Sequence, residues 1–234
     1  MLKGDEYQVI PGRLFYRTIA RENPRLLGAA MKFNASLHMD ALKSSLDNPG
    51  LGDFYPFFKT RPFPVSPRGL GFWDFEDESR RLALLDAETL KNLLLTWGTA
   101  FCAPFINRYV RRDDLEILER DIGRDLLSYA RGRGRFSLGA LPGIPRPEGD
   151  SPSPESMRSM IIAHAMKAHG ICISPWPEKL KSIEIGKIEQ YIPELAEYFS
   201  HVRDVPPSHL RSIWFSLKKI LLKEVAPQWT PCFS

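Results

Sequence analysis

The sequence predicts a mainly α-helical fold: a compact, irregular helical bundle with long proline-rich loops and room for one short strand pair. Three observations predict it. Apolar residues recur at steps of three and four over several long stretches, which is the spacing of one helix face. Capping residues stand where those stretches begin. The chain holds 20 prolines, where about 12 are usual at ~5% of residues, and proline interrupts helices because it has no N–H donor.

The composition is that of a globular protein. Of the 234 residues, 43% are hydrophobic and 26% are charged, which excludes collagen-like, purely coiled-coil and wholly disordered chains. The length corresponds to one or two domains. The net charge of +4 is mild, whereas a dedicated nucleic-acid surface shows a concentrated basic face. The chain lacks a signal peptide pattern and an apolar run of ~20 residues. We therefore expect a soluble, cytoplasmic protein.

The first expected helices precede residue 47. Asn23 and Pro24 form a start signal, because asparagine caps free N–H groups and proline loses no bond at the first helical position. Apolar residues at helical spacing follow, ending at Phe33. A second short helix is expected over residues 36–46, so this end of the chain is predicted to be helical in pieces.

Residues 47–75 lose the helical pattern and are rich in proline, glycine and aromatic residues, which predicts a long loop. Loops of this length are commonly functional or disordered, and the aromatic content favours docking over free disorder. Phe57, Phe58 and Trp73 are therefore candidate partner-binding residues. Alternatively, the aromatic residues of this loop pack on the protein's own helices, since exposed apolar patches are uncommon on monomers.

The most regular helical pattern lies between residues 86 and 132. Asp86 is expected to cap a helix over 87–102, in which Leu90, Trp97 and others form the apolar stripe. Pro104 is expected to kink or restart that helix, which then runs to about residue 110. A further helix is expected from residue 113 to Gly132, which can adopt a left-handed stop.

The glycine- and proline-rich residues 139–153 are the expected boundary between an N-terminal helical region, 1–138, and a C-terminal one, 154–234. The alternative is that both regions pack as a single domain. Beyond this loop, a helix is expected from Pro154 to about His169, ending at Gly170.

The remaining elements are a rigid turn, a segment of mixed pattern and two helices. The turn, Ser174–Pro177, places Trp176 at its centre, and Trp176 is a candidate partner-binding residue. Residues 183–188 alternate enough to leave a short strand open. Helices are expected over 193–202 and 208–225. The last has apolar residues on one face and basic residues on the other, of which Lys218 and Lys219 are candidate partner-binding residues.

Motifs for catalysis are missing from the sequence. It contains no HExxH metal pair, no GxSxG nucleophile turn and no GxxxxGK[ST] phosphate loop. Cys102, Cys172 and Cys232 are too widely spaced for a zinc ribbon or a redox pair, and we expect free thiols. The sequence therefore predicts a protein that is not an enzyme, with no catalytic residue, metal or cofactor. A pocket lined by His164, His169 and Cys172 would reopen that question.

Arg131, Arg133 and Arg135 form a compact basic cluster next to Phe136. The cluster has three interpretations: a solvated loop, a surface for an acidic protein partner, and a nucleic-acid contact, because arginine binds phosphate and aromatic rings stack on bases. The third gives an alternative function, that of a small helical nucleic-acid-binding regulator.

Three stretches resemble a known family. They are LALLDAETLKNLLLTWGTAFCAPFINRYV with LEILERDIGRDLLSYA, preceded by Gly69–Gly71; IIAHAMKAHG followed by SPWP; and LKKILLKEVAPQW. These stretches resemble the K-type accessory proteins of bacterial type III secretion (the SctK/YscK group), over roughly Gly69–Ala130 and Ser156–Gln228. The proline-rich loops Asn48–Pro67 and Gly139–Pro154 depart from the family's pattern.

The resemblance implies a non-enzymatic adaptor of the cytoplasmic sorting platform. Family members link the cytosolic domain of the inner-membrane ring protein to the scaffold protein that carries the stator and the ATPase. The resemblance thus implies these two protein partners, no small-molecule substrate, and a cytoplasmic location peripheral to the inner membrane through protein contacts. Amphipathic helices and aromatic loops are compatible with this role, because they can supply buried anchors at interfaces.

Overall fold

The computed structural model describes residues 29, 33, 75, 77–136, 138, 141, 143–144, 152–199 and 205–233. About 80% of these described residues are helical and none of them lies in a strand, which confirms the mainly α fold class. A single isolated β-bridge pairs Leu141 with Ile144. The chain divides into one unit of Met1–Leu84 with Pro231–Ser234 and a second unit of Leu85–Thr230.

The described residues of the first unit include a buried arginine. Arg81 lies in the 3₁₀ helix η2 (Glu78–Leu84) and is 9% exposed. Its Nε donates to the carbonyl of Phe75 at 2.8 Å, and its Nη1 donates to the carbonyl of Cys232 at 2.8 Å. Burial lowers the pKa of this guanidinium, although nearby Glu78 opposes the shift. The two carbonyls compensate for part of the hydration that the buried cation loses.

The second unit is organised around helix α4 (Ala87–Ile106). Asp86 caps it, and its Oδ1 accepts the backbone N–H of Thr89 at 2.8 Å. The predicted apolar stripe is buried: Leu90, Leu93, Leu94, Trp97 and Phe101 are all 0% exposed. The helix continues through Pro104 and ends at Ile106, so a restart at this proline and a helix running to about residue 110 are wrong. Pro104 has no N–H to donate to the carbonyl of Ala100, so the helix passes through it with one backbone hydrogen bond missing.

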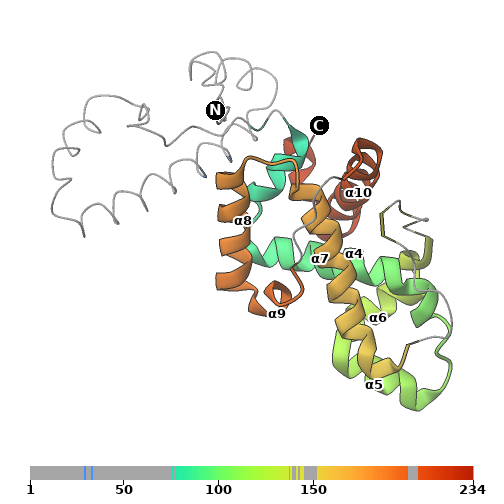
Figure 1. Cartoon of the computed structure of the whole chain (residues 1–234). Helices are drawn as coiled ribbons and strands as arrows, with labels where there is room; N and C mark the ends of the chain where they lie inside the picture. Colours follow the sequence, from blue (N-terminus) through green and yellow to red (C-terminus); the bar gives the residue numbers. More distant parts are fainter. Residues whose placement is uncertain are drawn as a thin grey trace, which may run out of the picture. The chain divides into compact units, whose positions relative to one another are not determined.

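Helix α7 (Met157–Ile173) crosses α4 at very short range (Figure 1). Gly98 of α4 makes the approach possible, because a Cβ built there would lie 2.4 Å from the carbonyl oxygen of Ile161. The two helices come from opposite sides of the expected boundary at 139–153, and both belong to the Leu85–Thr230 unit. Gly170, the expected stop, is buried inside α7, which extends three residues further.

The helix expected from residue 113 to Gly132 is divided in two. Helix α5 (Arg112–Ile122) and helix α6 (Arg124–Arg131) meet at Gly123, whose φ of 89° is readily adopted only by glycine. Helix α6 packs against α4, so the break at Gly123 is accompanied by packing on the central helix.

The remaining helices of this unit are α8 (Glu178–Tyr191), α9 (Pro193–Ala196) and α10 (Pro207–Ile220). The strand left open at 183–188 is wrong, because those residues lie within α8. The helix expected over 193–202 is the single turn α9. Helix α10 is followed by a π-helical turn, η5 (Leu221–Val225), and the 3₁₀ helix η6 (Pro227–Cys232). Within the described residues, no helix is both long enough and apolar enough to cross a membrane.

Candidate functional site

Helix α10 has an inner face in the core and an outer face with an exposed aromatic ring. Ile213, Leu217 and Ile220 are 0–1% exposed, whereas Phe215 is 68% exposed. Only two other large hydrophobic side chains, Val110 and Tyr191, are similarly exposed in the described part of the chain. Residues four apart lie on the same side of a helix. We therefore define the α10 outer face as Arg211, Phe215, Lys218 and Lys219.

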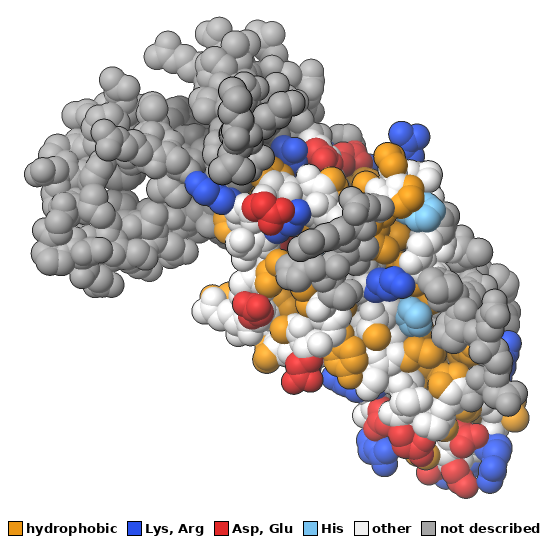
Figure 2. Space-filling model, viewed as in Figure 1, with side chains coloured by type: hydrophobic (Ala, Val, Ile, Leu, Met, Phe, Trp, Pro, Cys, Tyr) orange, Lys and Arg blue, Asp and Glu red, His pale blue; other side chains and the backbone are white. Residues whose placement is uncertain are grey.

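The charge of this region is strongly positive. Residues 207–230 carry four Lys or Arg side chains and one carboxylate, a formal net charge of +3, against +4 for the whole chain. The carboxylate, Glu224, is mostly buried, and its Oε2 lies 3.1 Å from Nη2 of Arg133. Figure 2 shows basic and hydrophobic side chains next to one another over α10. The outer face therefore combines an aromatic surface with concentrated positive charge.

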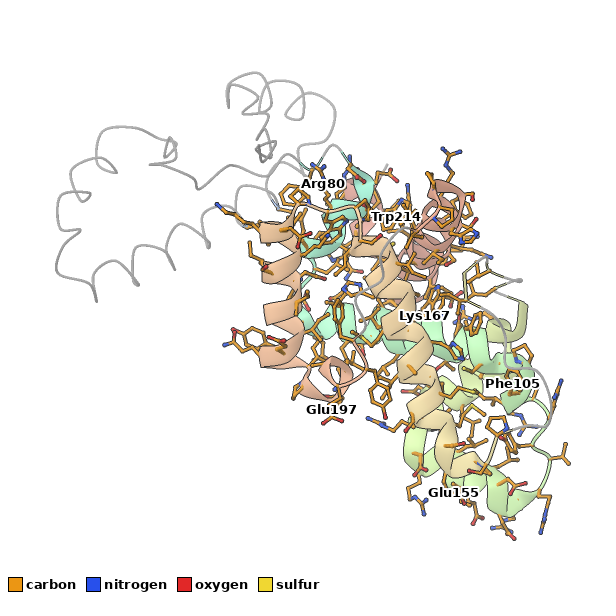
Figure 3. All side chains as sticks on the ribbon, viewed as in Figure 1. Arg80, Phe105, Glu155, Lys167, Glu197 and Trp214 are labelled. Atoms are coloured by element: carbon orange, nitrogen blue, oxygen red, sulfur yellow. The ribbon has the colours of Figure 1, made fainter. Side chains whose placement is uncertain are left out.

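A buried hydrogen bond fixes the other side of α10. Nε1 of Trp97 on α4 donates to Oγ of Ser216 at 2.8 Å, and Ser216 donates to the carbonyl of Ile213 at 2.7 Å. Trp97 is fully buried, as the sequence indicated for a core tryptophan. Trp214, labelled in Figure 3, is only half-buried beside the outer face. The hydrogen bond between Trp97 and Ser216 fixes the orientation of α10 against α4, so the side chains of the outer face project from a helix that is held in place.

Only part of the basic cluster at residues 131–135 is available to bind a partner or a phosphate. Arg131 at the end of α6 is exposed, and the Arg133 guanidinium forms the ion pair with Glu224 of η5. The side chain of Arg135 lies outside the described residues. One of the three predicted cations is thus already engaged within the protein, which weakens the case for a phosphate-binding cluster here.

The other candidate partner-binding residues divide into two groups. Trp176 is 2% exposed, so its ring belongs to the core and is not presented to a partner; this corrects the expectation from the sequence. The turn Ser174–Pro177 directs this large ring inward, where apolar burial stabilises it. Phe57, Phe58 and Trp73 lie outside the described residues, so they remain predictions.

A buried polar cluster, which the sequence reasoning missed, joins α7 to α8. His169 and Glu184 are both 0% exposed, and Nε2 of His169 lies 3.5 Å from Oε1 of Glu184. Nζ of Lys187 lies 2.7 Å from Oε2 of Glu184 and donates to the carbonyl of Leu85 at 2.9 Å. Glu184 stands four residues from the buried Leu180 and four from the buried Ile188. This spacing places Glu184 on the same side of the helix as two apolar residues, and it could have predicted that Glu184 is buried.

The electrostatics of this cluster favour a neutral imidazole. Burial lowers the pKa of His169, the neighbouring Glu184 raises it, Lys187 lowers it, and the net shift is downward. Because His169 and Glu184 are sealed from solvent, they have no access to a substrate in this conformation. Breaking one partner of such a buried ionic cluster typically costs ~3–5 kcal/mol. The cluster therefore acts on stability, fastening α8 to the start of α4.

The three residues that would have reopened the enzyme question do not line an accessible site. His169 and Cys172 are buried, and the half-buried His164 ring packs on Phe101 with a centroid distance of 4.8 Å.

Burial raises the pKa of the Cys102 thiol to about 12, so this sulfur is protonated and unreactive. In the portion that the structure describes, no group of three His, Cys, Asp or Glu residues could hold a metal ion.

Comparison with known proteins gives no relative. No protein-family model matches the chain, no curated protein is similar to it, and no solved structure matches it.

Proposed function

We propose that this protein is a non-enzymatic adaptor of the type III secretion cytoplasmic sorting platform. It would link the cytosolic domain of the inner-membrane ring protein to the scaffold protein that carries the stator and the ATPase, and would lie at the inner membrane through these partners. The assignment rests on the sequence resemblance over Gly69–Ala130 and Ser156–Gln228.

One structural observation carries the proposal: Phe215 is 68% exposed on a helix whose opposite side is locked into the core. Aromatic and arginine side chains are the residues that most often dominate binding energy at protein interfaces. A ring that projects from a fixed helix loses little conformational freedom on binding. The α10 outer face thus has the residue types and the rigidity of an interface anchor. It overlaps Leu217–Trp229, one of the stretches that resemble the K-type accessory proteins.

The test is co-purification of the full chain with each proposed partner separately. We expect the cytosolic domain of the ring protein and the scaffold protein each to be retained by the tagged chain. Loss of the protein should abolish secretion while its two partners are still produced. Retention of neither partner would contradict the adaptor function.

A titration with duplex DNA at low salt tests the alternative of a nucleic-acid-binding regulator. Nucleic-acid binding by the cluster at residues 131–135 would weaken steeply with added salt, because phosphate contacts release counterions. The adaptor proposal predicts no such salt-dependent binding.

A further inference from the structure

We infer that residues Pro231–Phe233 form a strap, a short segment that is bound within the first unit and detaches on its own while the second unit stays folded. The guanidinium of Arg81 holds the backbone of the strap, and the buried ring of Phe233 anchors it. The inference goes beyond the adaptor function and does not depend on it.

The strap is far in sequence from the rest of its unit. It continues directly from Thr230 of the second unit, yet it belongs to the unit of Met1–Leu84. Arg81 and Cys232 are 151 positions apart. The strap overlaps the end of η6, a 3₁₀ helix, and hydrogen-bond geometry in such helices is poorer than in α-helices. The local backbone therefore contributes little to holding the strap, and tertiary contacts must hold it.

Arg81 provides the polar connection to the strap. Its Nη1 donates to the carbonyl of Cys232 and its Nε donates to the carbonyl of Phe75, both at 2.8 Å. The guanidinium is planar and its donors have a fixed spacing, so it holds the two carbonyls in a defined position relative to each other. When the strap detaches, water reaches the guanidinium and replaces the lost acceptor, so no buried charge is left unsatisfied. This connection can therefore break and form again reversibly.

Phe233 provides the apolar connection. Its ring is 1% exposed, and the neighbouring Cys232 is 6% exposed. Detaching the strap exposes these two side chains and the surface that they cover, whereas unfolding the second unit exposes a much larger core, which includes Leu90, Trp97 and Phe101. A local opening that exposes few apolar side chains needs less free energy than global unfolding. We therefore expect the strap to open more often than the second unit unfolds.

The cysteines of the chain report this difference, because Cys102, Cys172 and Cys232 are all free and buried. Cys232 lies in the strap, whereas Cys102 and Cys172 lie in α4 and α7 of the second unit. The native full chain is treated with iodoacetamide at pH 8, and mass spectrometry of its peptides gives the labelling rate at each cysteine. Each rate is divided by the rate of the same thiol in urea, which removes differences in intrinsic reactivity. We expect Cys232 to be labelled at least about ten-fold faster than Cys102 and Cys172 on this scale.

Two variants weaken the two connections separately. Phe233→Ala removes the anchoring ring and should speed the labelling of Cys232 by about a hundred-fold or more. Arg81→Lys keeps the positive charge but has a single donor nitrogen, which cannot reach both carbonyls, and it should speed this labelling by about ten-fold. In both variants Cys102 should be labelled at the rate of the unaltered chain.

Phe215→Ala and Arg80→Lys are the matched controls. Phe215 is an exposed aromatic residue of the second unit. Arg80 is the arginine next to Arg81 in η2, and its Nε lies 3.9 Å from Oδ2 of Asp77. Neither substitution should change the labelling rate of Cys232 by more than about two-fold.

Equal labelling rates at Cys232 and Cys102 in the unaltered chain would overturn the inference, because the strap would then open only when the second unit unfolds as well. This comparison needs no variant, so it decides the matter even if Phe233→Ala or Arg81→Lys disturbs the folding of the first unit. Full reactivity of Cys232 in the unaltered chain would also overturn the inference, since the strap would then not be bound. The same holds if Cys102 is accelerated in step with Cys232 in either variant, or if Arg80→Lys acts on Cys232 as strongly as Arg81→Lys does.

Discussion

The substitution Gly98→Ala directly tests the close crossing of α4 and α7. Alanine is favoured over glycine inside a helix by about 1 kcal/mol. At Gly98, however, the new Cβ would lie 2.4 Å from the carbonyl oxygen of Ile161, about 1 Å closer than the ordinary contact that begins at 3.4 Å. The obstructing atom belongs to the backbone, so a rotamer change cannot relieve the clash and the helices must separate.

Overpacking of this kind costs about 1–3 kcal/mol, and the upper end applies where backbone must move. After the gain in helix propensity, we expect Gly98→Ala to lower the free energy of unfolding by about 2 kcal/mol. Gly186→Ala is the matched control, since Gly186 lies within α8 and a Cβ there meets no atom within 4 Å. This control should gain up to about 1 kcal/mol. The two variants should therefore differ by about 3 kcal/mol.

Urea unfolding followed by far-ultraviolet circular dichroism and tryptophan fluorescence measures both variants. With a slope of about 2–3 kcal/mol per molar urea, the midpoints should differ by roughly 1 M. Equal midpoints for the two alanine variants would refute the reasoning, because they would show that α4 and α7 do not touch at Gly98.

Three further predictions concern the core. Burial holds the pKa of His169 below its ordinary value of 6.5. As the pH falls, the imidazole is therefore protonated in the unfolded chain before it is protonated in the folded protein. The free energy of unfolding should consequently fall as the pH drops below about 6.5. Urea unfolding between pH 5 and 8 should show a weaker decline in His169→Gln, and an unchanged decline would contradict this. Ser216→Ala removes the acceptor of the buried Trp97 N–H and should cost about 1–3 kcal/mol in the same assay; no loss would argue against the hydrogen bond. The Cys102 thiol, with a pKa of about 12, should react with a thiol reagent at pH 8 only after unfolding; rapid labelling of the native chain would show that the core is open.

The sequence predicts the helices well where the local signals agree with the tertiary packing. Asp86 caps α4 as expected, because its side chain needs only the nearby Thr89 N–H. The boundaries are wrong where tertiary context decides. Helical spacing of apolar residues continues across Gly123, so the pattern alone does not reveal that the chain turns there. From the sequence, Gly170 is predicted to end α7. In the structure it is buried and the helix continues through it, because a glycine inside the core is compatible with a continuous helix.

The candidate site was predicted only in part. Lys218 and Lys219 were selected as basic residues and do lie on the outer side of α10. Phe215 was not selected, although it stands out of register with the apolar stripe of Ile213, Leu217 and Ile220, and that mismatch was readable. The buried position of Trp176 depends on how the turn after α7 folds back, which no local pattern encodes.

The central position of α4 has a consequence for biosynthesis. Two of the helices that pack on it, α7 and α10, begin at Met157 and Pro207, whereas α4 ends at Ile106, so the ribosome releases α4 before these two helices are made. Until then part of its leucine- and phenylalanine-rich side is left uncovered, and incompletely covered apolar surfaces of this kind promote self-association. The chain is therefore most prone to self-association before translation reaches residue 220.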